Sequence, residues 1–185
     1  MPVLPGEQVY LDENQLAQGH DYSEIGGLVI SPSQDLAAYP VDYAGNEIYQ
    51  LVVQRFDTAE IVFQDPSLVI GDGIEWGQDD DSLFYLKSDE AQRQFQVYRR
   101  DLNTNVEILL FEEPDILYWV GIYKSKDQRY LFVESASSEA SEIHYFDLLD
   151  DDLAELICIA TRRPKVLYSV QNFKTTWWMI SNVRD

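Results

Sequence analysis

Short runs rich in β-branched and aromatic residues alternate with short polar segments along nearly the whole chain. Each run is bounded by Asp, Asn, Ser, Gly or Pro, which favour turns. Helical periodicity is poor, and one short helix is predicted over Asp12–Gly19, with Asp12 as its N-cap. The strands that this pattern predicts are Gly27–Ile30, Leu36–Val41, Ile48–Arg55, Ile61–Phe63, Ile74–Trp76, Leu83–Lys87, Phe95–Arg100, Val106–Phe111, Trp119–Tyr123, Tyr130–Glu134, Glu142–Asp147, Ala154–Ala160, Leu167–Gln171 and Trp177–Ser181.

The same order of features occurs three times along the chain. A polar turn leads into a strand, a strand with a central aromatic residue follows, and an Asp-led turn closes the set. The central aromatic residues are Tyr49, Tyr98 and Tyr145, and a repeat of about 50 residues with four short strands is typical of propeller blades. A β-sandwich or barrel with coincidental spacing is the alternative.

The repeat therefore predicts an all-β fold, a partial β-propeller of about three and a half four-stranded antiparallel blades. Residues 1–22 form a lead-in segment, residues 23–66, 67–114 and 115–161 form three blades, and residues 162–185 begin a further blade. Closed propellers usually have about four to eight blades, so two sheet ends would stay open. We expect a piece of a longer protein, or a ring that another segment closes.

Composition narrows the classes of partner. The chain has 185 residues, 13 of them basic and 33 acidic, for a net charge of −20. This charge argues against nucleic acid and anionic membrane surfaces as partners. It could attract cationic ligands, although solubility is the simpler explanation. Cys158 is the single cysteine, and the start resembles no signal peptide, so we expect a cytoplasmic protein.

The sequence offers no pattern for nucleophilic catalysis. A nucleophile elbow needs Gly-x-Ser-x-Gly, and the nine glycines provide none. The two histidines are His20, in a predicted loop, and His144, in a predicted strand. We interpret both as structural residues, and no catalytic residue is predicted.

Metal and phosphate sites are not predicted either. The acidic runs Asp79–Asp81 and Asp150–Asp152 lack the alternating ligands of calcium loops, and we interpret them as solvated turns. Cys158 has no Cys or His at the local spacing of zinc sites. Gly71–Gly73 is not followed by the Lys-Ser or Lys-Thr of a phosphate loop. The expectation is therefore a chain without a cofactor or metal.

Several ordered segments carry a family resemblance. They are Val9–Tyr22, Ile25–Gly27 with Ser31-Pro32, Glu75-Trp76, Phe95–Arg100, Phe111–Asp115, Ser138–Ile143 and Thr161–Pro164. In this order they resemble the N-terminal propeller of the prolyl oligopeptidase family, in its oligopeptidase B (protease II) branch. One departure is Ser33-Gln34-Asp35, because the family commonly has an Asp-Gly turn after Ser-Pro.

The resemblance implies a seven-bladed propeller that covers an α/β-hydrolase domain. The Ser-Asp-His triad and the acidic pocket for Arg or Lys belong to that domain, so no catalytic residue is carried over to this chain. The implied partners are the hydrolase domain, the remaining blades and short basic peptides, and the implied role is a size-excluding gate.

Basic residues are scarce enough to be candidates for specific contacts. The resemblance implies interdomain or rim contacts at Glu47, Arg99, Arg100, Arg162 and Arg163. The simpler interpretation of the Arg pairs is neutralisation of acidic neighbours.

A free-standing truncated propeller that serves as a protein-binding scaffold is the alternative function.

Overall fold

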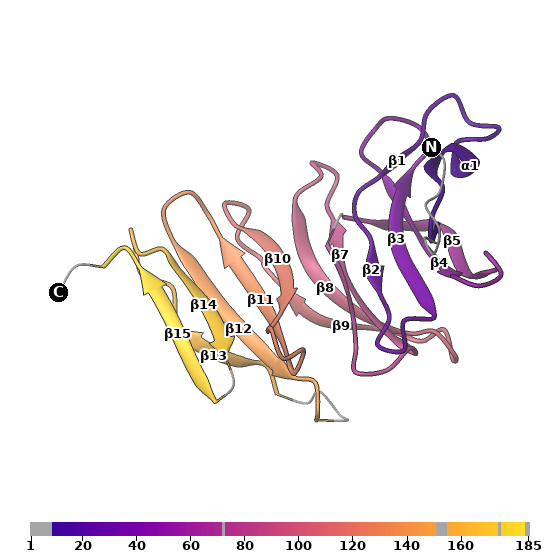
Figure 1. Cartoon of the computed structure of the whole chain (residues 1–185). Helices are drawn as coiled ribbons and strands as arrows, with labels where there is room; N and C mark the ends of the chain where they lie inside the picture. The colour runs from indigo at the N-terminus through magenta and orange to yellow at the C-terminus, as the bar shows by residue number, and fades with distance from the viewer. Residues whose placement is uncertain (1–8, 72, 151–154, 174, 184–185) are drawn as a thin grey trace.

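The computed structural model describes residues 9–71, 73–150, 155–173 and 175–183, with residues 67–69 and 173 described by their backbone alone. It is an all-β structure with one short helix in the described part of the chain (Figure 1). Each predicted strand overlaps an observed one, and the predicted fold class is confirmed. Within the described residues, the one strand that the pattern missed is the two-residue β1 (Glu24–Ile25).

The helix α1 (Glu13–Leu16) begins where the sequence predicts. Asp12 is its N-cap, and the Oδ1 atom of Asp12 accepts a hydrogen bond of 2.9 Å from the backbone N–H of Asn14. This bond satisfies a backbone donor that has no partner inside the helix. The helix ends at Leu16, before the predicted end at Gly19, and a turn continues to Gly19, which has a φ of 86°.

Three antiparallel sheets and a hairpin follow one another along the chain. The first sheet consists of β1, β2 (Val29–Ile30), β3 (Leu36–Asp42), β4 (Tyr49–Arg55) and β5 (Ile61–Ile70). The second consists of β6 (Ile74–Trp76), β7 (Ser82–Ser88), β8 (Gln94–Asp101) and β9 (Glu107–Glu112). The third consists of β10 (Trp119–Lys124), β11 (Tyr130–Ala136), β12 (Ser141–Asp147) and β13 (Ile157–Ala160). The hairpin is separate and consists of β14 (Tyr168–Phe173) and β15 (Thr176–Ser181).

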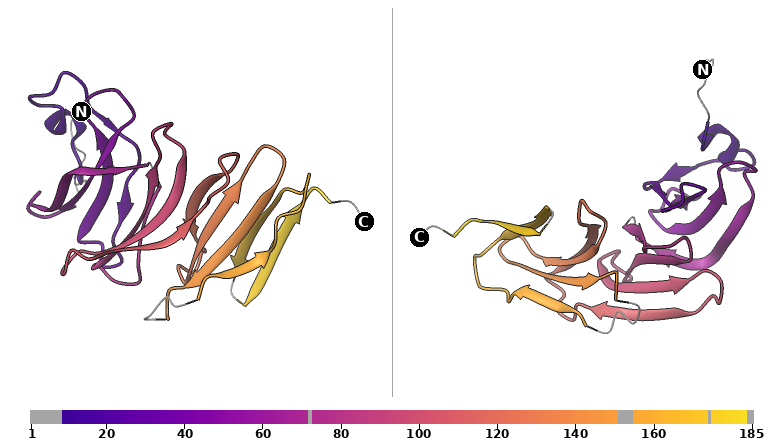
Figure 2. Two further views of the ribbon diagram at one scale, coloured as in Figure 1. Left: turned by 180° about the vertical axis from the view of Figure 1, so that it is seen from behind. Right: turned by 60° about the horizontal axis from the view of Figure 1, so that its bottom comes forward.

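In the first sheet β1 and β2 both pair with β3, and otherwise sequential strands pair within each sheet, which is the up-and-down order of a propeller blade. β5 runs across the boundary that the sequence predicts between residues 66 and 67, because its pairing with β4 continues to Ile70. The sheets stack side by side along an arc, with the two chain ends at opposite ends of the stack (Figure 2).

The core lies between the sheets rather than inside a single layer. Leu51 of the first sheet and Trp76 of the second belong to one buried cluster, and the Nε1 of Trp76 donates a 3.1 Å hydrogen bond to the carbonyl of Val29. Phe84 and Leu131 belong to the cluster between the second and third sheets. Each sheet thus buries its apolar faces against its neighbours, as stacked blades must.

Two turns keep a left-handed backbone without glycine. Gln34 and Gln128 have φ values of 67° and 64°, in turns that precede β3 and β11. The departure from an Asp-Gly turn therefore leaves the turn conformation in place, at the steric cost that a Cβ brings to this region.

Candidate functional site

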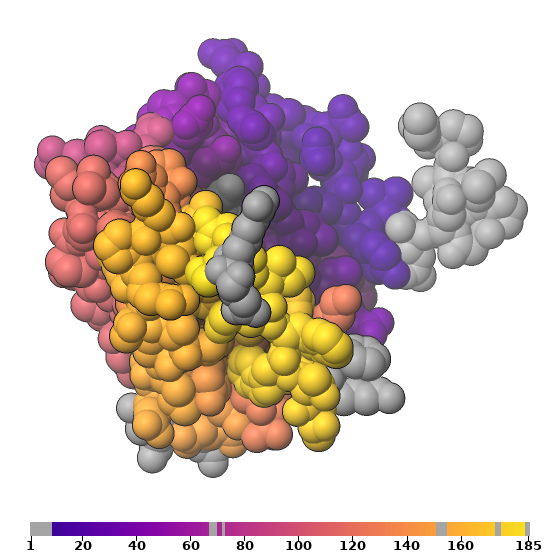
Figure 3. Space-filling model, turned by 90° about the vertical axis from the view of Figure 1, so that its left-hand side faces the viewer, coloured from indigo at the N-terminus to yellow at the C-terminus, as the bar shows by residue number. Residues whose placement is uncertain are grey.

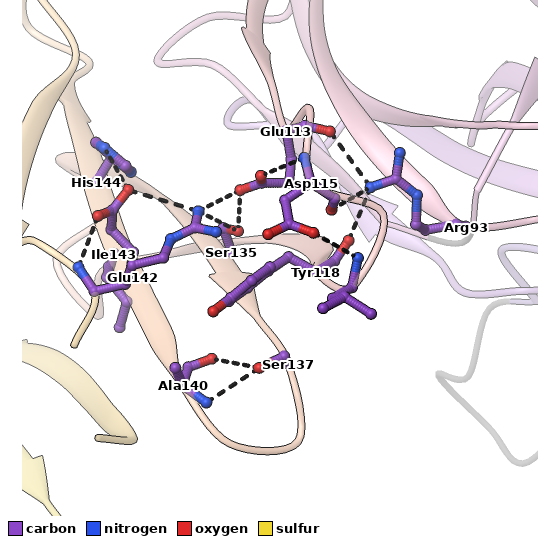
Figure 4. Close-up of polar contacts among 12 residues, drawn as sticks. Arg93, Glu113, Asp115, Tyr118, Ser135, Ser137, Ala140, Glu142, Ile143 and His144 are labelled. Carbon is purple, nitrogen blue, oxygen red and sulfur yellow. Dashed lines mark hydrogen bonds and ion pairs between the residues drawn. The ribbon is translucent and has the colours of Figure 1, made fainter. Parts of the chain in front are cut away.

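Loops at one end of the sheets are joined by polar contacts, and we call this end the interblade face. It comprises residues 43–48, 89–93, 113–118, 137–140 and 161–167. The amide of Gln92 donates a 2.9 Å hydrogen bond to the carbonyl of Asn46, which links the first two sheets. Three charged side chains make further links: Arg93 and Glu113, which Figure 4 labels, and Arg162.

Arg93 fixes the connection between the second and third sheets. Its side chain is 9% exposed, and its Nε pairs with the carboxylate of Asp89 at 2.9 Å. Its Nη1 donates to the carbonyl oxygens of Glu113, Asp115 and Tyr118 at 3.3, 3.0 and 3.0 Å. One guanidinium thus binds three carbonyls of the loop between β9 and β10.

The buried Glu113 and Arg162, whose side chain is 26% exposed, form an ion pair at the same junction. The Glu113 side chain is 3% exposed and also accepts hydrogen bonds from the Ser135 hydroxyl and the Asp115 N–H. Burial alone would raise the pKa of Glu113, but the hydrogen bonds from Arg162 and Ser135 outweigh it, so this pKa lies below the usual value. The Arg162 guanidinium stacks 3.8 Å from the centre of the Tyr118 ring.

A shallow hollow of about 400 Å³ opens beside this pair. Arg162, Arg163 and Lys165 line it together with Leu117 and Tyr118. Leu117 is 70% exposed and its neighbour Ile116 is 77% exposed. Cationic and apolar groups therefore share one surface of a strongly acidic chain, a composition suited to contact with another protein surface.

The structure divides the predicted contact residues between the two ends of the sheets. Glu47, Arg162 and Arg163 lie on the interblade face. Glu47 is exposed, has a φ of 59° and donates its N–H to Asp42 Oδ2 at 2.8 Å. Arg99 and Arg100 lie toward the opposite end of β8, where Arg100 is paired with Leu83.

Arg100 belongs to a polar cluster within the second sheet. Its side chain is 8% exposed, and its Nη2 contacts the Glu107 carboxylate at 2.8 Å while its Nε donates to the Tyr85 hydroxyl at 3.2 Å. Lys87 contacts the other oxygen of Glu107 at 2.6 Å. Arg99 donates to the Ser82 hydroxyl at 3.1 Å. The polar partners of both arginines therefore belong to their own sheet, and the Arg100 guanidinium also lies 5.2 Å from the ring centre of Phe63 in the first sheet.

The two histidines lie far apart in sequence and have different surroundings. The His20 ring stacks on Tyr43 with ring centres 3.8 Å apart. His144 lies on β12 with its Nε2 3.5 Å from Glu142 Oε1, and burial lowers the pKa of its imidazole. No hydrogen bond joins either side chain to a serine within the described residues.

The acidic run Asp79–Asp81 forms a hydrogen-bonded turn. Oδ1 of Asp79 accepts from the N–H groups of Asp81 and Ser82 at 3.1 and 2.9 Å. Asp80 accepts a 3.0 Å bond from the N–H of Ser33 in the first sheet. Of the other predicted loop features, part of Asp150–Asp152 and the central residue of Gly71–Gly73 lie outside the described residues.

Cys158 has neighbours that its position along the chain does not reveal. It lies opposite His144 in the β12–β13 pairing, and Glu142 is near both. Burial raises the pKa of the Cys158 thiol. The sequence analysis tested local spacing only, and the cross-strand register supplies the histidine that this spacing lacked.

Sequence reasoning also missed Arg93 and Glu113 as residues that order the interblade face. The scarcity of basic residues is a signal that could have drawn attention to Arg93, as it did to Arg162. Glu113 is 49 residues from Arg162, so no local pattern connects them.

Among the described residues, no helix is long and apolar enough to cross a membrane.

Comparison with known proteins places these features in a family context. Residues 2–185 match the family described as prolyl oligopeptidase, N-terminal beta-propeller domain. The chain is 32% identical over 179 residues to Protease 2 of Moraxella lacunata, covering 95% of this chain and 26% of that protein. It is 28% identical over 182 residues to dipeptidyl aminopeptidase BI of Pseudoxanthomonas mexicana, covering 96% and 24%.

Solved structures give the same picture. Oligopeptidase B from Leishmania major superposes with a TM-score of 0.84 at 31% identity, over 97% of this chain and 26% of that one. Oligopeptidase B from Trypanosoma brucei, with covalently bound antipain, superposes with a TM-score of 0.84 at 30% identity. The chain thus spans about a quarter of the length of these relatives.

Proposed function

Because the chain belongs to the prolyl oligopeptidase family and matches its N-terminal β-propeller domain, we propose that it is the non-catalytic propeller part of a serine oligopeptidase. In this role it covers the active site of a catalytic domain outside this chain and admits short peptides that are cleaved after basic residues. The observation that carries the proposal is the 31–32% identity to oligopeptidase B and Protease 2 along nearly the whole chain.

The net charge of the chain supports the proposed preference for peptides with basic residues. A net charge of −20 attracts cationic peptides and raises their local concentration near the opening of a propeller. The single cysteine is consistent with the cytoplasmic location that we propose for the protein.

We assign the contact with the catalytic domain to the interblade face. The exposed Ile116 and Leu117 offer apolar area, and Arg163 and Lys165 offer positive charge beside it. A surface of this composition fits an acidic patch with an apolar centre on the partner domain.

A longer protein that joins this chain to a catalytic domain of the family tests the gate. We expect it to cleave fluorogenic peptides that contain one arginine, with a rate that falls steeply as the peptide is lengthened. The present chain alone should cleave none of them. Cleavage by this chain that a serine-directed inhibitor blocks, or a rate in the longer protein that is independent of peptide length, would contradict the proposal.

A matched pair of charge reversals in that longer protein tests the docking face. Lys165→Glu should change the ratio of long-peptide to short-peptide cleavage, because Lys165 lies on the interblade face. Lys126→Glu, in the exposed turn at the opposite end of the third sheet, should leave the ratio unchanged. Equal effects of the two variants would remove the docking assignment.

The scaffold alternative makes a different prediction for the isolated chain. A free-standing scaffold would form one defined oligomer with a compact radius in multi-angle light scattering. The oligopeptidase proposal expects no such assembly.

A further inference from the structure

We propose that Glu142, His144 and Cys158 form a binding site for a zinc-type divalent cation on the third sheet. The site stands apart from the proposed function and uses none of the residues assigned to docking. Its basis is a group of three side chains of the types that ligate zinc, brought together by strand pairing.

The register of β12 and β13 creates this group. His144 is paired with Cys158 across the two antiparallel strands, and the ladder is irregular between Ile143 and His144. Glu142 precedes His144 by two residues and therefore lies on the same face of β12. One ligand atom from each side chain lies within 4.8 Å of the other two.

These distances suit a tetrahedral metal after small side-chain adjustments. Zinc binds thiolate sulfur, imidazole nitrogen and carboxylate oxygen at about 2.0–2.3 Å, which places neighbouring ligand atoms roughly 3.5 Å apart. Three protein ligands leave the fourth position for water. Calcium and magnesium prefer six or more oxygen ligands, so the thiolate selects a softer cation.

The imidazole of His144 provides an independent indication. Its Nδ1 is buried and has no hydrogen-bond partner, while its Nε2 is 3.5 Å from Glu142 Oε1. Phe111 of the second sheet contacts the ring with centres 5.4 Å apart and offers no acceptor. Buried polar atoms are nearly always paired, and a metal ion bound through Nδ1 would supply the missing partner, whereas one bound through Nε2 would leave it unpaired. Figure 4 shows His144 and Glu142 next to each other at the edge of the ion-pair network.

Arg162 is the strongest argument against a cation, because its Nη2 lies 3.8 Å from Glu142 Oε1. However, this guanidinium has its own partner in the buried carboxylate of Glu113. On binding, Cys158 releases its thiol proton to solvent, so a divalent cation meets one thiolate and one carboxylate. The two negative charges balance the metal, and Arg162 stays balanced by Glu113.

Access and consequence follow from the position of the site. Cys158 is partly exposed, so an ion can reach it from solvent. The bound metal would connect β13, the last strand of the third sheet, to β12 and add to the stability of the folded chain by mass action.

Cobalt(II) is the probe, and the reduced full chain is the sample. Cys158 is the single cysteine, so a thiolate-to-cobalt charge-transfer band can only report this residue. We expect a band that saturates at one cobalt per chain, with the visible spectrum of four-coordinate cobalt, and its displacement by zinc. Cys158→Ser should abolish the band.

The histidines provide a matched control. His144→Gln and Glu142→Gln should each weaken cobalt binding by roughly tenfold or more, since loss of even a supporting contact costs a metal site about 10–100-fold. His20→Gln should bind like the unchanged chain, because His20 stacks on Tyr43 near the N-terminal end. No band, a band unaffected by His144→Gln, or a stoichiometry of one cobalt per two chains would each overturn the proposal.

Alkylation of the unchanged chain tests the site without any variant. Zinc should slow the reaction of Cys158 with iodoacetamide, followed by mass spectrometry, and the same concentration of magnesium should not. An alkylation rate that zinc leaves unchanged would also overturn the proposal.

Discussion

Two similar strands at opposite ends of the stack of sheets differ in burial. At the N-terminal end, all seven residues of β3 are buried, because the second sheet lies on one side and the lead-in segment on the other. Leu11 and Leu16 of the lead-in pack against Tyr39 and Val41. At the C-terminal end, all six residues of β15 are exposed.

Figure 3 shows the C-terminal end from outside, where the hairpin, in yellow, faces the viewer beside the orange part of the chain that precedes it. Trp178 and Ile180 are 62% and 71% exposed, and Trp178 and Met179 border a hollow of about 330 Å³ with Cys158. The residues of β15 are as apolar as those of β3. This difference shows that local sequence specifies a strand, whereas burial of its faces depends on a neighbouring sheet or segment that packs on them.

The sharpest test of this comparison truncates one aromatic residue at each end. Tyr39→Ala should lower the free energy of unfolding by about 4 kcal/mol, because the ring is fully buried and its removal leaves a cavity. Trp178→Ala should change it by less than about 1 kcal/mol, because the side chain is mostly exposed. Urea unfolding of both variants measures the two values, and equal losses would show that the hairpin face is covered in solution.

The second prediction concerns the ion pair of Arg162 with the buried Glu113 on the interblade face. Arg162→Leu should cost about 3 kcal/mol, since it leaves the Glu113 carboxylate buried without its cation. Arg163→Leu is the matched control and should change stability by less than about 0.5 kcal/mol, because Arg163 is exposed. Urea unfolding at pH 7 measures both.

The pH dependence of the Arg162→Leu deficit checks its cause. The folded-state pKa of Glu113 is lowered, so its contribution is present above the unfolded value of about 4.3 and is lost as pH falls through the folded value. A protonated Glu113 no longer needs Arg162. The deficit should therefore shrink in acid, and a deficit that is constant with pH would mean that Arg162 acts through packing on Tyr118 instead.

The third prediction removes part of the N-terminal cover. Leu16→Ala should cost about 1.5 kcal/mol, because Leu16 is partly buried against the outer face of the first sheet. It should also increase self-association in light scattering, since it uncovers apolar surface near Tyr39. Gln18→Ala, an exposed position in the following turn, is the control and should change neither measurement.

Much of this fold could be predicted from the sequence because its determinants are local. Turn residues delimit each strand, and a repeat of about 50 residues orders the strands into blades. The two-residue β1 was missed because Glu24–Ile25 holds a single β-branched residue, whereas the equally short β2 lies in the apolar run Leu28–Ile30. The cover of β3 by Leu11 and Leu16 also escaped, because it depends on how the lead-in folds back.

The candidate sites depend on contacts between distant residues, and the sequence alone could not supply them. Arg162 stood out as a scarce basic residue, but its partner Glu113 lies 49 residues away. His144 and Cys158 meet through a strand register with an irregularity, which no spacing along the chain reports. Pairings of this kind become visible only when the register is known.

The last prediction compares Glu134, which lies on β11, with Glu113, which accepts a hydrogen bond from Ser135 of the same strand. Burial raises the pKa of Glu134, so its protonated form favours folding: that contribution is present below about pH 4.3 and is lost as pH rises through the folded value. Glu134→Gln should therefore stabilise the chain at pH 7, with a gain that disappears below about pH 4.3. Glu113→Gln should do the opposite and destabilise it at pH 7, because Glu113 is charged and paired. Urea unfolding across pH measures both, and a loss for Glu134→Gln at pH 7 would show that its carboxylate is paired in the folded chain.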